Sequence, residues 1–148
     1  MRKPSQFWFQ FHYDSRGYGE IVLMDEMTCM GVWLARTGSI DRTGKLINAI
    51  DPHNWFICNA PEKTNEVAMC ILGLPGFGWK WRLNTIPEPA DHESSPYLIH
   101  PDGNLPGSLG CPALQGTNAP ELYHFAMWQF TQVPDGIIRF VITKSETL

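Results

Sequence analysis

A histidine and a cysteine stand eleven positions apart in a segment rich in proline and glycine. His100 ends the apolar run Y-L-I-H, and Cys111 closes the following stretch P-D-G-N-L-P-G-S-L-G-C. A cysteine nucleophile needs a nearby base, partial exposure, and hydrogen-bond donors for the oxyanion that forms on the substrate. A strand ending at His100 would hold the imidazole, and the prolines and glycines allow the chain to turn back toward it. The pattern is typical either of acyl transfer by a Cys–His pair or of a turn with an incidental histidine and thiol.

The residues next to Cys111 fit supporting roles around such a nucleophile. Gly110 allows the backbone to come close to a substrate, and N–H groups near Gly110 and Cys111 can point at one oxygen atom. Ser108 can pin the loop or donate a proton. Pro112 has no N–H, so the donors for an oxyanion must come from the cysteine side of that bond.

A metal site is the alternative use of these side chains. His92, His100 and Cys111 are ligand types that zinc accepts, but their spacing is not typical of a zinc site. The four cysteines form no C-x-x-C pair, so we expect neither a cysteine-rich metal site nor any cofactor. The other three cysteines lie inside apolar runs, where we expect buried, inert thiols. They are Cys29, Cys58 and Cys70.

Length and composition bound the class of protein. The 148 residues suit one domain spanning 1–148, and 43% hydrophobic against 18% charged residues exclude a disordered chain. A net charge of −4 without a basic stripe gives no footprint for nucleic acid or an anionic membrane. No apolar run reaches the length of a membrane span, and the N-terminus lacks a secretory signal. We therefore expect synthesis in the cytoplasm.

Alternating and apolar runs predict a mostly β fold. Aromatic residues alternate with polar ones over 7–13, which is the period of a half-buried strand. Residues 20–26 and 30–36 predict a hairpin, and 136–144 predict a last strand. Four more runs, each bounded by Gly, Pro or Asn, predict strands over 54–58, 67–72, 80–86 and 97–100. Seven or eight short strands indicate a β-sandwich or barrel.

One helix is predicted after the cysteine loop. Asn118 and Glu121 have the spacing of a capping box, and Pro120 suits a first turn. Apolar residues then recur at helical spacing until V-P-D-G ends the helix. They are Leu122, Phe125, Ala126 and Phe130.

The stretch I-H-P-D-G-N-L-P-G-S-L-G-C resembles the active-site signature of the L,D-transpeptidase (YkuD-type) family. In that signature a histidine at a strand end is followed by Ser or Thr, any residue, Gly and the nucleophilic Cys. The earlier L-A-R-T-G at 34–38 resembles the family's strand that ends in Ser/Thr-Gly. The short interval between His100 and Ser108 is similar to that of compact phage- or effector-like members. The resemblance also implies a β-sandwich with a helix soon after the cysteine.

The resemblance implies a role for each residue of the stretch. Cys111 would be the nucleophile that carries the acyl group, with His100 as its base and Ser108 to Gly110 as the positioning turn. The substrate implied is the peptide stem of bacterial peptidoglycan, cut or exchanged at a diamino acid–D-alanine bond. We expect a further set of polar residues to bind the substrate. They are Asp102, Asn104 and Arg82.

The implied enzyme is a transpeptidase, carboxypeptidase or endopeptidase, and the alternative is a non-catalytic peptidoglycan-binding or virion-structural module that retains the loop. It would act in the periplasm or cell wall after delivery by another system, with a delivery partner or an immunity protein as a further partner. Pro112-Ala113 stands where the family has an aliphatic residue and then Arg or Asn. Three strand-borne cations are candidates to replace that support: Arg36, Arg82 and Arg139.

Two geometric and chemical expectations follow for the Cys–His pair. The side chains of His100 and Cys111 should lie within hydrogen-bond reach, or about one water apart, at the mouth of a cleft. If His100 draws the proton, the thiol of Cys111 should ionise well below the pKa of about 8.5 of a free cysteine.

Overall fold

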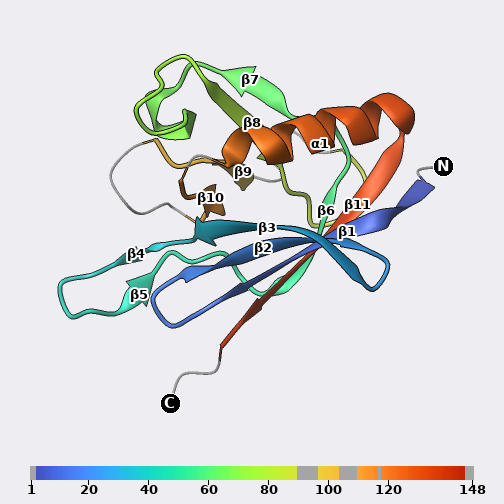
Figure 1. Ribbon diagram of the computed structural model, residues 1–148. Coiled ribbons are helices and arrows are strands. Elements are labelled where there is room, and N and C mark those ends of the chain that lie inside the picture. The colour runs from blue at the N-terminus through green and yellow to red at the C-terminus, as the bar shows by residue number, and fades with distance from the viewer. Residues whose placement is uncertain (1–2, 90–96, 104–109, 117, 146–148) are drawn as a thin grey trace.

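A curled β-sheet with one helix packed inside the curl forms the structure (Figure 1). The computed structural model describes residues 3–89, 97–103, 110–116 and 118–145. Nine strands form one sheet in the order β6-β11-β1-β2-β3-β10-β9-β8-β7, and β4 and β5 form a separate two-stranded ribbon. Two neighbouring pairs, β1–β11 and β9–β10, are parallel, and the others are antiparallel.

The strands of the sheet are β1 (Lys3–Tyr13), β2 (Tyr18–Asp25), β3 (Thr28–Arg36), β6 (His53–Ile57), β7 (Glu62–Thr64), β8 (Gly78–Arg82), β9 (Leu98–Pro101), β10 (Ala113–Leu114) and β11 (Gly136–Lys144). The ribbon is β4 (Ser39–Ile40) and β5 (Leu46–Ile47), and the helices are the 3₁₀ turn η1 (Val67–Met69) and α1 (Ala119–Gln132).

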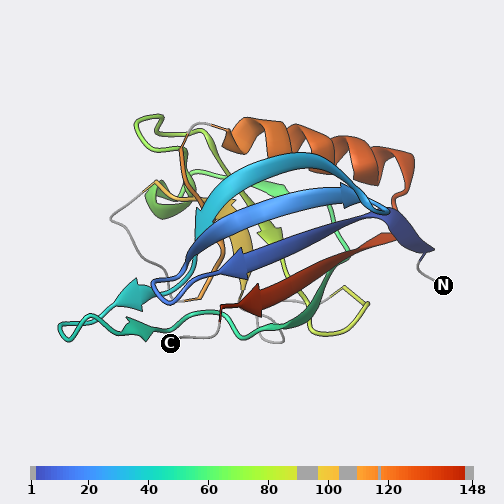
Figure 2. The same ribbon diagram turned by 60° about the horizontal axis from the view of Figure 1, so that its bottom comes forward.

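The curl of the sheet brings strands from its two halves together. The rings of Phe9 on β1 and Trp81 on β8 meet edge to face, with centroids 5.6 Å apart. At the margin, Phe56 on β6 and Asn84 just after β8 exchange two backbone hydrogen bonds of 2.8 and 2.7 Å. Figure 2 shows the same curvature from below, with α1 behind the arc of β1, β2 and β3. The sheet is therefore a half-barrel that is nearly closed at β6 and β8.

Apolar residues at alternating strand positions fill the space between the sheet and the helix. Phe9, Phe11 and Tyr13 of β1 are buried, as the alternation over 7–13 predicted. On α1, Leu122, Ala126 and Phe130 belong to the same buried cluster. One apolar face of the helix therefore packs against one face of the sheet.

The predicted class, mostly β with one helix after the cysteine loop, is confirmed. The described residues form eleven strands instead of seven or eight, because four of them are only two or three residues long. The hairpin and the strands at 54–58, 97–100 and 136–144 are confirmed, and the strand at 80–86 is β8, which ends at Arg82. The four strands of two or three residues, which are β4, β5, β7 and β10, are too short for an alternation pattern to be recognised.

Two local predictions were wrong. Residues 67–72 are not a strand: Val67–Met69 form η1, and the chain then turns between Ile71 and Phe77. Asn118 is the N-cap of α1, but its side chain makes no capping hydrogen bond, so no capping box forms. The backbone N–H of Glu121 instead donates to the carbonyl of Asn118, and Pro120 lies in the first turn as predicted.

We expect Phe9→Ala to lower the free energy of unfolding by about 3 to 5 kcal/mol, because it leaves a cavity between β1, β8 and β11. Val32→Ala, on the exposed side of β3, should change the free energy of unfolding by about 0.5 kcal/mol or less. Urea unfolding of both variants measures the difference. Equal effects would mean that the contact between the two halves of the sheet contributes little.

Candidate active site

Parallel pairing of β9 and β10 brings His100 and Cys111 together from either side of the loop. His100 lies opposite Ala113, and its backbone N–H donates to the carbonyl of Pro112 at 3.3 Å. Cys111 comes just before β10, and the backbone N–H of Leu98 donates to its Sγ at 3.4 Å. Leu98 and His100 are two residues apart, so their N–H groups both face β10. The histidine is thus held on β9, and the thiol is held against β9 by the segment that leads into β10.

The tautomer of His100 is set by a hydrogen bond to the backbone. Its Nδ1 lies 2.6 Å from the carbonyl oxygen of Pro101. A carbonyl only accepts, so Nδ1 carries the hydrogen and Nε2 keeps its lone pair in the neutral ring. The side chain is only 7% exposed, and burial lowers the pKa of His100, against smaller opposing effects of the Pro101 bond and of Asp102 and Glu66. The imidazole is therefore neutral near pH 7, with Nε2 able to accept a proton.

The thiol of Cys111 is half-buried, and this decides its ionisation. Burial raises the pKa of Cys111, while the N–H of Leu98 and the charge of Arg82 act in the opposite direction with smaller effect. The prediction of a thiol with a low pKa was therefore wrong for the resting protein, because desolvation outweighs both favourable contacts. Within the described residues no hydrogen bond joins His100 to Cys111, so their approach to within one water stays a prediction.

Gly110 has a backbone conformation that needs glycine. Its φ of +114° lies in the region that side chains rarely adopt, and a Cβ there would lie 2.6 Å from Cε1 of Tyr97. The carbonyl of Gly110 accepts a hydrogen bond of 3.0 Å from Oγ1 of Thr37, which itself accepts one of 3.0 Å from the N–H of Ile50. Thr37 is fully buried, so this hydroxyl fixes the residue before the cysteine to two other segments.

The three candidate cations lie in different places. Arg82 lies opposite Leu98 on β8, and its charge lowers the pKa of Cys111. Arg36 lies opposite Ala113 on β3, where it is buried and donates from Nη1 to the hydroxyl of Tyr18 at 3.0 Å. Arg139 on β11 instead lies over the ring of Trp8, with Cζ 5.3 Å from the ring centroid. Arg82 is therefore the cation that acts on the thiol.

The remaining predicted site residues divide between described and undescribed parts of the chain. Asp102 follows β9, and its Oδ2 accepts a hydrogen bond of 2.9 Å from Nε2 of Gln115. Asn104, Ser108 and His92 lie outside the described residues. Among the described residues, no group of three or more His, Cys, Asp or Glu side chains could hold a metal ion.

The other cysteines confirm the prediction only in part. Cys58 and Cys70 are buried, as expected from their apolar runs. Cys29 is exposed, and its expected burial was wrong. It lies at the start of β3, two residues after Met27 in the hairpin turn, so the core does not cover it.

Several groups that support the site were not identified as such from the sequence. They are the N–H of Leu98, the carbonyl of Pro101, the ring of Tyr97 and the hydroxyl of Thr37. The first two are backbone groups, and every sequence supplies such groups at every position. Thr37 did have a signal, since it is the threonine of L-A-R-T-G.

Comparisons of the chain with protein-family models, with curated proteins and with solved structures found no match. In the described part of the chain, no helix has the length and apolar character needed to cross a bilayer.

We expect Thr37→Val to lower the free energy of unfolding by about 1 to 3 kcal/mol, because the N–H of Ile50 and the carbonyl of Gly110 lose a buried partner. Thr43→Val is the control: that hydroxyl bonds Asp41 in an exposed turn, and its loss should cost about 0.5 kcal/mol or less. Chemical denaturation measures both, and an equal loss in the two variants would contradict the role of Thr37.

We expect Cys111 to react with iodoacetamide more slowly than the exposed Cys29 at pH 7, because burial disfavours its thiolate. Its rate should rise with a midpoint above the pKa of about 8.5 of a free cysteine. Arg82→Met should move that midpoint higher still, and Arg139→Met, on a distant strand, should not. Mass spectrometry of the labelled peptides across pH gives all four rates. A midpoint well below the pKa of about 8.5 of a free cysteine would contradict this prediction and show an ionised resting thiol.

Proposed function

We propose that this chain is a cysteine-dependent acyl-transfer enzyme of the L,D-transpeptidase type that acts on the peptide stem of bacterial peptidoglycan. The observation that carries the proposal is the parallel pairing of β9 and β10, with His100 on β9 and Cys111 two residues before β10. The sequence I-H-P-D-G-N-L-P-G-S-L-G-C supports the same assignment through its resemblance to the family's signature.

In the first step, Nε2 of His100 takes the proton of the Cys111 thiol as Sγ attacks the carbonyl carbon of the diamino acid. The carbonyl oxygen becomes an oxyanion in the tetrahedral intermediate. When this collapses, the bond to the D-alanine nitrogen breaks, and the amine leaves with the proton from Nε2. A thioester of Cys111 and a neutral imidazole remain.

In the second step, an amine of another stem or a water molecule attacks the thioester. Nε2 again accepts the proton of the attacking group, and Sγ leaves as the thiol when Nε2 returns it. An amine gives an exchanged peptide bond, and water gives hydrolysis. Transpeptidase, carboxypeptidase and endopeptidase activities thus use the same two residues and differ only in the attacking group or the bond cut.

The charges around the pair suit a base that acts during the attack and not before it. The thiol of Cys111 stays protonated at rest because burial raises its pKa, and burial keeps His100 neutral. Proton transfer would then accompany the attack, with the N–H of Leu98 and the charge of Arg82 stabilising negative charge on Sγ. Arg82 would replace the support that the family obtains from an Arg or Asn after the cysteine, and it would also contact the substrate together with Asp102.

A second candidate function is a non-catalytic peptidoglycan-binding or virion-structural module. The raised pKa of the Cys111 thiol favours it. A thiol that stays protonated is a weak nucleophile, and a loop that only binds peptidoglycan does not need a nucleophile. Both functions would place the protein in the periplasm or cell wall after delivery by another system. A delivery partner or an immunity protein would then be a second partner besides the stem peptide.

We expect the purified protein, mixed with isolated cell walls, to create new cross-links between diamino acids or to remove terminal D-alanine. Chromatography and mass spectrometry of the muropeptides measure both products. Cys111→Ala should abolish them, and His100→Gln should lower the rate about 10²- to 10⁴-fold. Cys29→Ala, which changes an exposed thiol elsewhere, should leave the profile unchanged.

An unchanged muropeptide profile with the wild-type protein would contradict the enzyme. Cosedimentation of the wild-type protein with the same cell walls would then support the binding module. Activity that survives Cys111→Ala would contradict the proposed nucleophile.

A further inference from the structure

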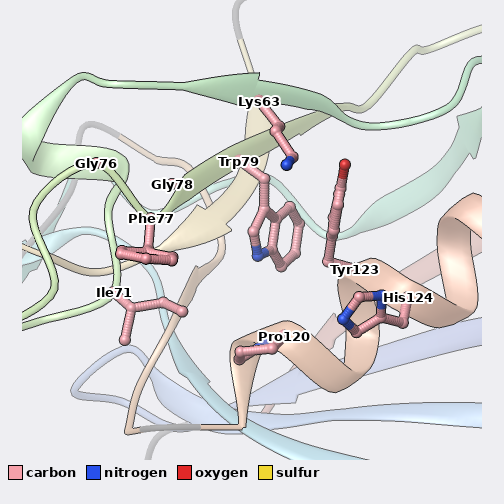
Figure 3. Close-up of a pocket in the computed structure, with 9 residues that line it drawn as sticks. All are labelled: Lys63, Ile71, Gly76, Phe77, Gly78, Trp79, Pro120, Tyr123 and His124. Atoms are coloured by element: carbon pink, nitrogen blue, oxygen red, sulfur yellow. The ribbon is translucent and has the colours of Figure 1, made fainter.

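A pocket of about 620 Å³, its open mouth included, lies between the β7–β8 hairpin, the turn after η1 and the first turns of α1 (Figure 3). Lys63 and Trp79 are register partners, so their side chains share the face that looks toward α1. Lys80 and Arg82 alternate with Trp79 and lie on the other face, toward Cys111. We call this space the helix pocket; its lining is Lys63, Ile71, Gly76, Phe77, Gly78, Trp79, Pro120, Tyr123 and His124.

A buried hydrogen-bond donor without a partner faces the helix pocket. Trp79 is only 3% exposed, and its Nε1 has no hydrogen-bond acceptor among the residues that the structure describes. In Figure 3 this nitrogen faces the side of the pocket where Ile71, Phe77 and Pro120 lie. An unpaired buried N–H is costly, and a carbonyl oxygen from a ligand would remove that cost. The ring of Phe77, which also lines the pocket, is 64% exposed, so a ligand can displace it with little loss of packing.

The turn beside the helix pocket presents apolar side chains to solvent. Leu72, Leu74 and Phe77 are all exposed, although the turn between Ile71 and Phe77 is ordered. Three backbone hydrogen bonds of 2.9 to 3.1 Å hold it, from Ile71 to Phe77, from Leu74 to Ile71 and from Phe77 to Leu74. An ordered turn that exposes apolar residues next to a pocket is typical of a surface that binds another molecule.

Charge and strand position indicate what kind of molecule binds. Lys63 lies at the pocket, and no Asp or Glu is among the lining residues, so a carboxylate fits this rim. β7 is the last strand of the sheet order, so its outer edge has no neighbouring strand among the described residues. An extended peptide can pair with such an edge through its backbone.

We propose that the helix pocket binds an extended peptide segment of a partner protein that carries an aliphatic side chain two residues before a carboxylate. The aliphatic side chain fills the space between Ile71, Phe77 and Pro120, a peptide carbonyl accepts from Nε1 of Trp79, and the carboxylate pairs with Lys63. The spacing of two follows from the strand, in which alternate side chains share a face. This inference goes beyond the acyl-transfer proposal and does not depend on it.

Two other classes of partner fit less well. A sugar could stack on the exposed ring of Phe77, but it would not pair with the outer edge of β7, and the ring of Trp79 is almost wholly buried. An anionic membrane attracts clusters of basic residues, and Lys63 is the only Lys or Arg that lines the helix pocket. A peptide uses the pocket, the donor and the strand edge together.

The test uses the indole N–H signals of the whole protein in ¹⁵N-labelled NMR spectra. The probe is acetyl-Thr-Leu-Thr-Asp-Thr-amide, and the matched peptides replace Asp with Asn or place Leu and Asp side by side. We expect the probe to move the Trp79 signal downfield in a saturable way. Nε1 of Trp33, which is also buried and has no partner in the described part of the chain, is the internal control and should not move.

The charge and the spacing each have their own control. The Asn peptide should bind about two- to fivefold more weakly, as expected for a partly exposed ion pair. Lys63→Met should remove that difference, and Lys80→Met, on the opposite face of the hairpin, should preserve it. The peptide with adjacent Leu and Asp should bind more weakly than the probe, because its two side chains face opposite ways.

Three results would overturn the proposal. The first is a Trp79 signal that does not move up to the solubility limit of the probe. The second is equal binding of the Asp and Asn peptides by the wild-type protein. The third is binding to phosphatidylglycerol vesicles without binding to peptides, which would assign the exposed turn to a membrane. The same peptide titration with the Cys111→Ala variant separates binding in the helix pocket from any turnover of the peptide at the cysteine.

Discussion

Two residues hold the sheet together. β10 consists of Ala113 and Leu114 alone, and it pairs with β3 on one side and with β9 on the other. Without it, the five strands from β6 to β3 and the three strands from β9 to β7 would be joined among the described residues by the single bridge between Phe56 and Asn84. Both residues are fully buried, so there is no room for larger side chains or for a kink. The candidate nucleophile comes two residues before this strand, and its position is fixed by the same pairing that unites the fold.

That constraint explains how much the sequence could predict. The long alternating strands and the helix were predictable, because periodicity and length are local properties of the chain. β10 was not, since two residues show no period, and its pairing depends on residues of β3 and β9 far away in the sequence. The candidate pair His100 and Cys111 was recognised through loop chemistry and motif, yet their neighbours on the strands were not.

The chemistry of the cysteine was harder to predict than its position. A histidine nearby in sequence suggested an ionised thiol, but ionisation depends on the balance between desolvation and charge, which only three-dimensional packing sets. The same packing makes the histidine a neutral base through the carbonyl of Pro101. A buried thiol and a buried neutral base form a pair in which neither group carries charge at rest. Charge separation then requires a third participant, which the substrate's developing oxyanion would supply.

The parallel pairing of β1 with β11 joins the two ends of the chain. β1 pairs early with β2 on one side, but its other edge finds β11 only after that strand has left the ribosome, and the outer edge of β3 likewise waits for β10. Contacts of such long range slow folding, because a large loop must close before any of them forms. The sheet, with the pairing that positions the cysteine, is therefore complete only once segments far apart in the sequence have met.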